Sequence, residues 1–398
     1  MDISILELDS EYWFSHSIDI EDAVRFFEKE FNYRGCVDRD AEARRVFGIV
    51  ERGCDRVYVI FGPRGCGKTT FFKCIYEVLQ KYYSNTAWSH YQEPTVESIR
   101  ELKDRLSREF ARETFSESLI SELLELANAT TAIPFSHVVN IVLHILREVG
   151  RILRQRGYEH LIIILDEAYT SSVEMAVAEV KQFIEISYNI MKDIEKIYGL
   201  KTSIFVVTRY ETIVNSLMRA SSKCSFSMMW NLDKVSTEKL CRIRGHLQGP
   251  DLDTLYKITG GNPRELEFLI SNGIRRWIYE VTSRVVMNSK VRELLLNEKY
   301  REALRQLVNN VDELDYVDEN VRQVLLQENF IIFLLPDDFF LSGTRPKTSI
   351  ELGIGDVYAW ELPVYMYVFD VLVREPDLIR QPSEIARKVL ENVSARPV

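Results

Sequence analysis

The stretch that decides the fold is Gly62-Pro63-Arg64-Gly65-Cys66-Gly67-Lys68-Thr69. It follows an apolar, β-branched run at residues 56–61 and precedes a helix that we expect from Lys68 to about Tyr82. Glycines spaced in this way let successive backbone N–H groups turn inward, and the start of the following helix adds positive potential. The eight residues match G-x-x-x-x-G-K-[ST] in full and predict a phosphate-binding P-loop.

Each position of this loop has a predicted role. Lys68 is expected to reach the terminal phosphates and to assist catalysis, and the Thr69 hydroxyl is expected to ligate Mg²⁺. Cys66 is interpreted as a small side chain that the loop tolerates, with a redox-sensitive thiol as the alternative. The other predicted nucleotide contacts come from Gly62, Pro63, Arg64, Gly65, Gly67 and Thr70.

A second pattern, LIIILDE at residues 161–167, is an apolar run that ends in two adjacent carboxylates. The run is typical of a buried strand, so Asp166 and Glu167 are expected at the carboxyl edge of a sheet. There Asp166 can hold the Mg²⁺ shell and Glu167 can act as general base on the attacking water. The alternative is a strand end that meets solvent, and the P-loop upstream favours the catalytic interpretation.

A third apolar run, TSIFVVT at residues 202–208, leads directly to Arg209. A strand inserted beside the Asp-Glu strand would direct its last residues at the γ-phosphate. Thr208 would then help to position the water, and Arg209 would meet the charge of the transferring group. A loop arginine in solvent is the alternative.

The fourth pattern is TGGNPRE at residues 259–265. Glycine ends one helix, Asn262 caps the next, Pro263 takes its first position, and Glu265 completes a capping box. Arg264 places a cation in the first turn, where the helix dipole disfavours it, and a nearby anion would remove that conflict. We therefore expect Pro263 and Arg264 to face a bound nucleotide.

Strands that alternate with helices predict a parallel sheet covered on both faces. The expected fold class is α/β: a P-loop NTPase core of the additional-strand class, with a helical lid and a C-terminal winged-helix-like domain. We expect further strands at 86–91 and 329–335 and a last one before residue 364, and helices over 40–51, 95–157 and 173–198. The expected domains are a helical lead-in (1–35), the α/β core (36–231), the lid (232–287) and the C-terminal domain (288–398).

In their order, these motifs resemble the archaeal ATPase family, which is allied to the STAND branch of AAA+ proteins and more distantly to the Orc/Cdc6 initiators. Residues 37–42, VDRDAE, are similar to the family's entry motif, with Val37 and Asp40 departing from it. The resemblance covers roughly residues 36–285. It implies that Arg209 is a sensor arginine, that Pro263 touches adenine, and that Arg264 is a second sensor arginine.

The charge of the chain bears on its partners. Fifty basic and sixty acidic residues give a net charge of −10, so the molecule as a whole repels polyanions. Arg345 and Lys347 are expected at the tip of the predicted wing, but acidic residues precede them at 312–319. A protein partner or a homo-oligomer is therefore favoured over DNA.

Composition also bears on the compartment. The six cysteines contain no C-x-x-C pair, which is typical of a reduced cytosolic protein. No apolar run approaches the length of about 18 residues that a membrane span needs. We therefore expect a cytoplasmic protein without a membrane segment.

The sequence leaves three functions open. The favoured one is an ATPase that uses ATP or ADP with Mg²⁺ as a nucleotide-driven conformational switch. The second is an initiator-like or mobile-element-associated ATPase whose winged helix binds DNA. The third is a scaffold that nucleotide stabilises but that turns over little.

Overall fold

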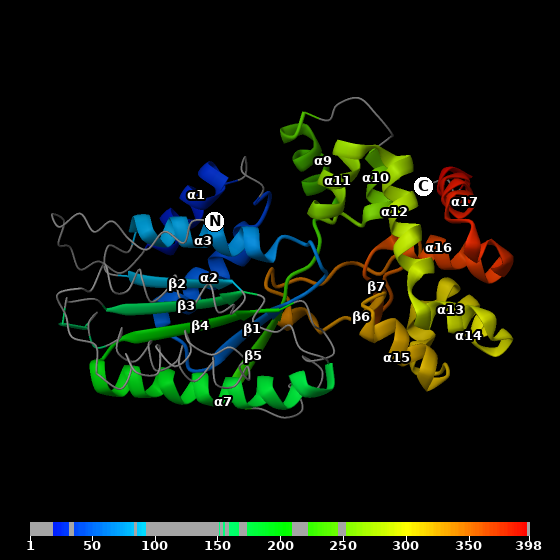
Figure 1. Ribbon diagram of the computed structural model, residues 1–398. Coiled ribbons are helices and arrows are strands. Elements are labelled where there is room, and N and C mark those ends of the chain that lie inside the picture. Colours follow the sequence, from blue (N-terminus) through cyan, green and yellow to red (C-terminus); the bar gives the residue numbers. More distant parts are fainter. Residues whose placement is uncertain are drawn as a thin grey trace, which may run out of the picture.

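The computed structural model of the 398-residue chain describes residues 19–31, 36–82, 86–92, 151, 154–155, 159–166, 173–208, 222–245 and 252–395 (Figure 1). Most of the helical stretch expected over 95–157 lies outside these residues. The helical lead-in is described from Asp19 and contains helix α1, Ile20–Phe31. Ala23, Val24, Phe27 and Phe31, which lie on one face at helical spacing, are buried.

A parallel sheet forms the first half of the described structure. Its five strands lie in the order β2-β3-β4-β1-β5. Strand β4 lies between β3 and the P-loop strand β1, which confirms the inserted strand of the additional-strand class. The bounds are β1 Val57–Phe61, β2 Thr86–Gln92, β3 His160–Asp166, β4 Lys201–Val207 and β5 Cys224–Met228.

Strand β5 was not predicted from the sequence. Its residues, CSFSM, alternate small polar and apolar side chains over a short stretch, which gives a weak strand signal. The strand is nevertheless buried, because it pairs with β1 along its whole length. It carries the chain from the sheet directly to the lid.

Helices cover both faces of the sheet. In Figure 1, α1 and α3 (Lys68–Tyr82) lie on one face, and α7 (Val173–Tyr198) runs along the other. Helix α2 (Asp40–Arg52) packs against α1 and β4. The sheet and these helices share one hydrophobic core, which explains the almost unbroken apolar runs of β1, β3 and β4.

The rest of the chain is mostly helical and has a second hydrophobic core. This core contains residues of the lid (232–287) and of the segment 288–398, here called the C-terminal module. The domain boundaries expected from the sequence stay a prediction. The bounds of the helices are α9 Lys234–Ile243, α10 Leu252–Thr259, α11 Pro263–Asn272, α12 Ile274–Met287, α13 Ser289–Leu296, α14 Glu298–Asn309, η1 Val311–Asp315, α15 Glu319–Gln327, η2 Asp337–Phe339, α16 Pro363–Arg374, η3 Pro376–Arg380 and α17 Pro382–Ala395.

The C-terminal module contains a two-stranded antiparallel ladder, as expected. Strand β6 (Ile331–Phe333) pairs with β7 (Tyr358–Trp360). Helices α16 and α17 follow the ladder, and α16 is buried along nearly its whole length. The winged-helix assignment stays a prediction. Within the described residues, no helix is long and apolar enough to cross a membrane.

The cysteines correct one expectation. Cys36, just before the entry motif, is joined to Cys74 of α3 by a disulfide, although the sequence suggested that all six cysteines are reduced. The two residues lie 38 positions apart, so no short spacing motif could reveal the pair. The disulfide attaches the entry motif to the helix that begins at the P-loop.

Candidate functional site

The P-loop connects β1 to α3, as the sequence predicted. Gly62, Gly65 and Gly67 have φ angles of +143°, +87° and +99°, a region that L side chains rarely adopt. A Cβ atom on Gly62 would lie 2.0 Å from the carbonyl oxygen of Met229, at the end of β5. The backbone conformation therefore favours glycine at all three positions, and at Gly62 the close approach of the neighbouring strand also leaves no room for a Cβ atom.

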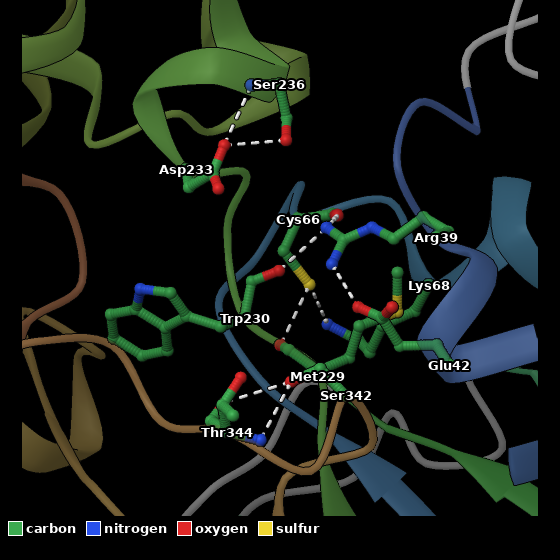
Figure 2. A network of polar contacts seen from close by, with 10 residues as sticks. All are labelled: Arg39, Glu42, Cys66, Lys68, Met229, Trp230, Asp233, Ser236, Ser342 and Thr344. Atoms are coloured by element: carbon green, nitrogen blue, oxygen red, sulfur yellow. Dashed lines mark hydrogen bonds and ion pairs between the residues drawn. The ribbon is translucent and has the colours of Figure 1, made fainter.

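The predicted phosphate-binding lysine lies within the loop. Lys68 is 8% exposed, and its Nζ donates to the carbonyl oxygens of Gly62 at 2.8 Å and Pro63 at 3.0 Å. The same Nζ lies 3.7 Å from the sulfur of Cys66. Cys66 itself is buried and donates its thiol to the oxygen of Met229 at 3.3 Å, which agrees with its interpretation as a structural residue (Figure 2).

The entry motif contains a buried ion pair whose arginine also contacts the P-loop. Arg39 is 6% exposed and pairs with Glu42, which is 3% exposed, at 2.6 Å. The other terminal nitrogen of Arg39 donates to the carbonyl oxygens of Cys66 at 3.0 Å and Trp230 at 2.7 Å. Figure 2 shows this arginine between the P-loop and the segment that leads from β5 to the lid.

The start of α11 lies directly on the P-loop. The Asn262 side-chain amide donates to the carbonyl oxygen of Arg64 at 2.9 Å. The backbone N–H of Arg264 donates to the carbonyl oxygen of Gly65 at 3.3 Å. A Cβ atom on Gly67 would lie 4.0 Å from the ring of Pro263. The predicted lid residues and the P-loop are thus brought together.

Only half of the predicted capping box is present. The Asn262 side chain caps α11 by accepting the N–H of Glu265 at 3.2 Å. The Glu265 carboxylate does not return to Asn262, because it accepts the indole N–H of Trp277 at 2.6 Å instead. Arg284 lies 3.4 Å from the same carboxylate oxygen.

The carboxyl ends of the parallel strands meet beside the P-loop. Asp166 is the last residue of β3 and lies opposite Val207 in the register with β4. Thr208 follows β4, is 3% exposed, and donates its N–H to Ile60 of β1 at 2.9 Å. The side chain of Asp166, and both Glu167 and Arg209, lie outside the described residues.

One residue of the site was missed by the sequence analysis. Glu361 of the C-terminal module accepts the backbone N–H of Arg64 at 2.7 Å and is 7% exposed. Burial raises the pKa of this carboxyl to about 7, although the Arg64 N–H and the charge of Lys68 act to lower it. No motif marks Glu361, because its partner lies 297 residues away in the chain.

The model of a protein family described as an ATPase domain predominantly from Archaea matches residues 36–269, more than half of the chain. The chain belongs to this family. The match runs from the entry motif into α11 of the lid, and so includes the P-loop and the start of α11 but not Glu361 of the C-terminal module.

Other comparisons add little. No curated protein matches the chain. A solved structure titled "Structure of Drosophila ORC bound to DNA" is similar with a TM-score of 0.31 and 12% identity, over 95% of this chain and 72% of that one. A likeness at this level carries no functional argument.

The residues present fit the phosphate groups of a nucleotide. A carboxyl oxygen of Glu361 accepts the Arg64 N–H, so this backbone donor is directed at an oxygen acceptor. Thr69, in the first turn of α3, offers a hydroxyl oxygen, a donor of the kind that Mg²⁺ prefers. The described residues of the loop therefore suit the phosphates of a nucleotide.

Proposed function

We propose that this family member binds ATP with Mg²⁺, hydrolyses it, and acts as a nucleotide-driven conformational switch. The observation that carries the proposal is a complete P-loop at the start of α3 with the lid residues Asn262, Pro263 and Arg264 resting on it. Phosphates bound there would lie between the sheet and the lid, so the two parts would respond together to the nucleotide.

Binding would use the groups that surround the loop. The backbone N–H groups of the P-loop, with Thr70, would hold the phosphates, and Lys68 would leave the carbonyls of Gly62 and Pro63 to reach the terminal ones. Pro263 and Arg264 would close over the nucleotide from the lid. Thr69 and Asp166 would hold Mg²⁺, which neutralises charge on the phosphates when bound.

Hydrolysis would use residues at the carboxyl edge of the sheet. Glu167 would act as general base on the attacking water. Thr208, held beside β1 by its hydrogen bond to Ile60, would help to position that water. Arg209, the next residue, would stabilise the charge of the transferring group.

The shared core of the lid and the C-terminal module supports the proposed switch. Because residues of both pack in one hydrophobic cluster, a movement of the lid on the nucleotide would carry the module with it. Arg345, predicted for the wing tip, donates to the carbonyl oxygens of Gly355 and Asp356 within its own module. We therefore favour a protein partner or a homo-oligomer over DNA. The cytoplasmic location is proposed from the sequence alone, and the Cys36–Cys74 disulfide does not support it.

The test compares three variants by anisotropy of a fluorescent ATP analogue and by phosphate release. Lys68→Ala should abolish binding, and Glu167→Gln should bind ATP but retain it unhydrolysed. Lys73→Ala, on an exposed position of the same helix, should behave as wild type. Binding by Lys68→Ala at wild-type strength would contradict the assignment of the site.

The switch itself requires a second measurement. Light scattering after size exclusion, with ADP, with an ATP analogue and with duplex DNA, should show a change of assembly that depends on the ATP analogue. Comigration with duplex DNA would instead support the initiator-like function. An unchanged profile in all conditions would leave the scaffold as the better description.

A further inference from the structure

The C-terminal module places one carboxylate in the P-loop. Glu361 directly follows β7, and its backbone N–H donates to the carbonyl oxygen of Phe330 at 2.9 Å. Its position is therefore fixed by the β6–β7 ladder. Its side chain leaves the module and accepts the N–H of Arg64 at 2.7 Å.

The connection between module and lid is equally close. Pro363, two residues after Glu361, packs on Gly260 at the start of the TGGNPRE segment, where an added Cβ would meet the proline ring at 2.9 Å. Trp360, on the other side of Glu361, is 1% exposed. Glu361 therefore cannot leave the P-loop far without a movement of the module.

The carboxylate occupies the end of the loop that serves the terminal phosphate. Lys68 contacts the carbonyls of Gly62 and Pro63, the two residues immediately before Arg64. In a P-loop this lysine reaches the β- and γ-phosphates, whereas the start of the helix holds the phosphates nearer the nucleoside. The Arg64 amide that donates to Glu361 thus lies near Lys68 and near the position expected for the terminal phosphate.

Two anions cannot share this position at low cost. Glu361 is almost fully buried, and the charged groups that face it are Arg64 and Lys68 of the loop and Glu265 of the lid. A γ-phosphate would add a further negative charge beside a carboxylate that water barely reaches. A proton on the carboxyl would remove its charge but would leave its oxygen on the Arg64 amide, so the carboxyl must leave for a phosphate to bind that amide.

We propose that Glu361 makes the site distinguish ATP from ADP: the terminal phosphate of ATP displaces its carboxylate from the Arg64 amide and so releases the C-terminal module from the P-loop. This inference rests on the proposed function, because it presumes that nucleotide phosphates bind the loop. Glu361 is then a positioning residue, because the position of the C-terminal module depends on whether the bound nucleotide has a third phosphate.

The test measures the affinities for fluorescent ATP and ADP analogues separately. Glu361→Gln removes the charge, and Glu361→Ala removes the contact. Both should raise the affinity for the triphosphate by about tenfold, the size expected when one hydrogen bond to a charged group no longer competes. The affinity for the diphosphate should change much less.

A matched control uses the same module. Glu351→Gln makes the same substitution ten positions earlier, outside the contact with Arg64, and should leave both affinities at wild-type values. Hydrogen exchange adds a structural measurement: a non-hydrolysable ATP analogue should increase exchange in 330–335 and 357–362 of the wild type, and ADP should not. A thermal melt of each variant shows that it is folded.

The outcomes separate the two proposals. If the wild type binds ATP but Glu361→Gln changes neither affinity, or changes both equally, Glu361 is not a selector and the proposed function stands. Unchanged or reduced exchange in the ATP-bound wild type also overturns the inference. If neither the wild type nor the Glu361 variants bind nucleotide, the proposed function and the role of Glu361 both fail. If only the Glu361 variants bind nucleotide, the result supports the proposed function and the role of Glu361.

Discussion

Gly65→Ala tests whether the lid rests on the P-loop in the nucleotide-free protein. Gly65 has a φ of +87°, and a Cβ atom there would lie 2.7 Å from Cβ of Arg264 and 2.7 Å from Oδ1 of Asn262. Both neighbours belong to the start of α11, whose contacts with the loop are backbone and amide hydrogen bonds. The substitution therefore affects the junction between the sheet and the lid.

The expected cost has two parts. An L residue in the left-handed region costs about 1–2 kcal/mol, and inserting an atom into a packed contact costs about 1–3 kcal/mol. We therefore expect Gly65→Ala to lower the free energy of unfolding by about 2–5 kcal/mol. Urea titration of the nucleotide-free protein, followed by tryptophan fluorescence, measures this change.

Two further glycines provide controls that separate strain from packing. Gly245 also has a positive φ, +72°, but an added Cβ would meet no atom of the described residues within 4 Å. Gly245→Ala should therefore cost only the strain, about 1–2 kcal/mol. Gly48 lies inside α2 with equally open space, and Gly48→Ala should stabilise the protein by up to about 1 kcal/mol.

The test compares the loss in free energy of unfolding between Gly65→Ala and Gly245→Ala. If Gly65→Ala loses no more than Gly245→Ala, the close packing of the lid on the P-loop is refuted. Saturating nucleotide should stabilise the wild type and Gly245→Ala alike, because Gly245 lies away from the loop contacts. It should stabilise Gly65→Ala less.

Three other predictions concern stability. Burial raises the pKa of Glu361 from its ordinary value of 4.5 to about 7, so the protonated carboxyl stabilises the folded protein below pH 4.5 and this stabilisation is lost as the pH rises through 7. Urea titrations should show that the free energy of unfolding falls by about 3 kcal/mol over this range in the wild type but not in Glu361→Gln. Arg39→Ala should lower the free energy of unfolding by about 3–5 kcal/mol, because Glu42 is left buried without its partner. Replacing Cys36 and Cys74 by Ser should cost up to about 4 kcal/mol, because the unfolded chain loses a closed loop.

Each of these has a control. For Glu351→Gln, the free energy of unfolding should depend on pH as it does in the wild type. If Glu361→Gln also shows the wild-type pH dependence, the raised pKa of the buried Glu361 carboxyl is contradicted. Arg387→Ala removes an exposed arginine with two carboxylate partners and should lower the free energy of unfolding far less than Arg39→Ala. An equal loss for the two variants would contradict the buried pair. A reducing agent should destabilise the wild type but leave the Cys36/Cys74 double variant unchanged.

Much of the core was predictable because its signals are local. The glycines of the P-loop are required by backbone angles that few other residues adopt, so the motif itself indicates the turn. The apolar runs of β1, β3 and β4 indicate buried strands, and the periodicity of α1 indicates its buried face. Strand β5 was missed because five residues of alternating serine carry too weak a pattern.

The P-loop, strands β1, β3 and β4 and the helix after the loop were predictable from the sequence, because each depends on side chains within a few residues of one another. The distant groups that complete the site are brought together only by packing in the folded protein. Arg39 reaches Trp230 across 191 residues, Asn262 reaches Arg64 across 198, and Glu361 reaches the same residue across 297. Such contacts depend on how the lid and the C-terminal module pack against the sheet, and no local periodicity encodes that packing.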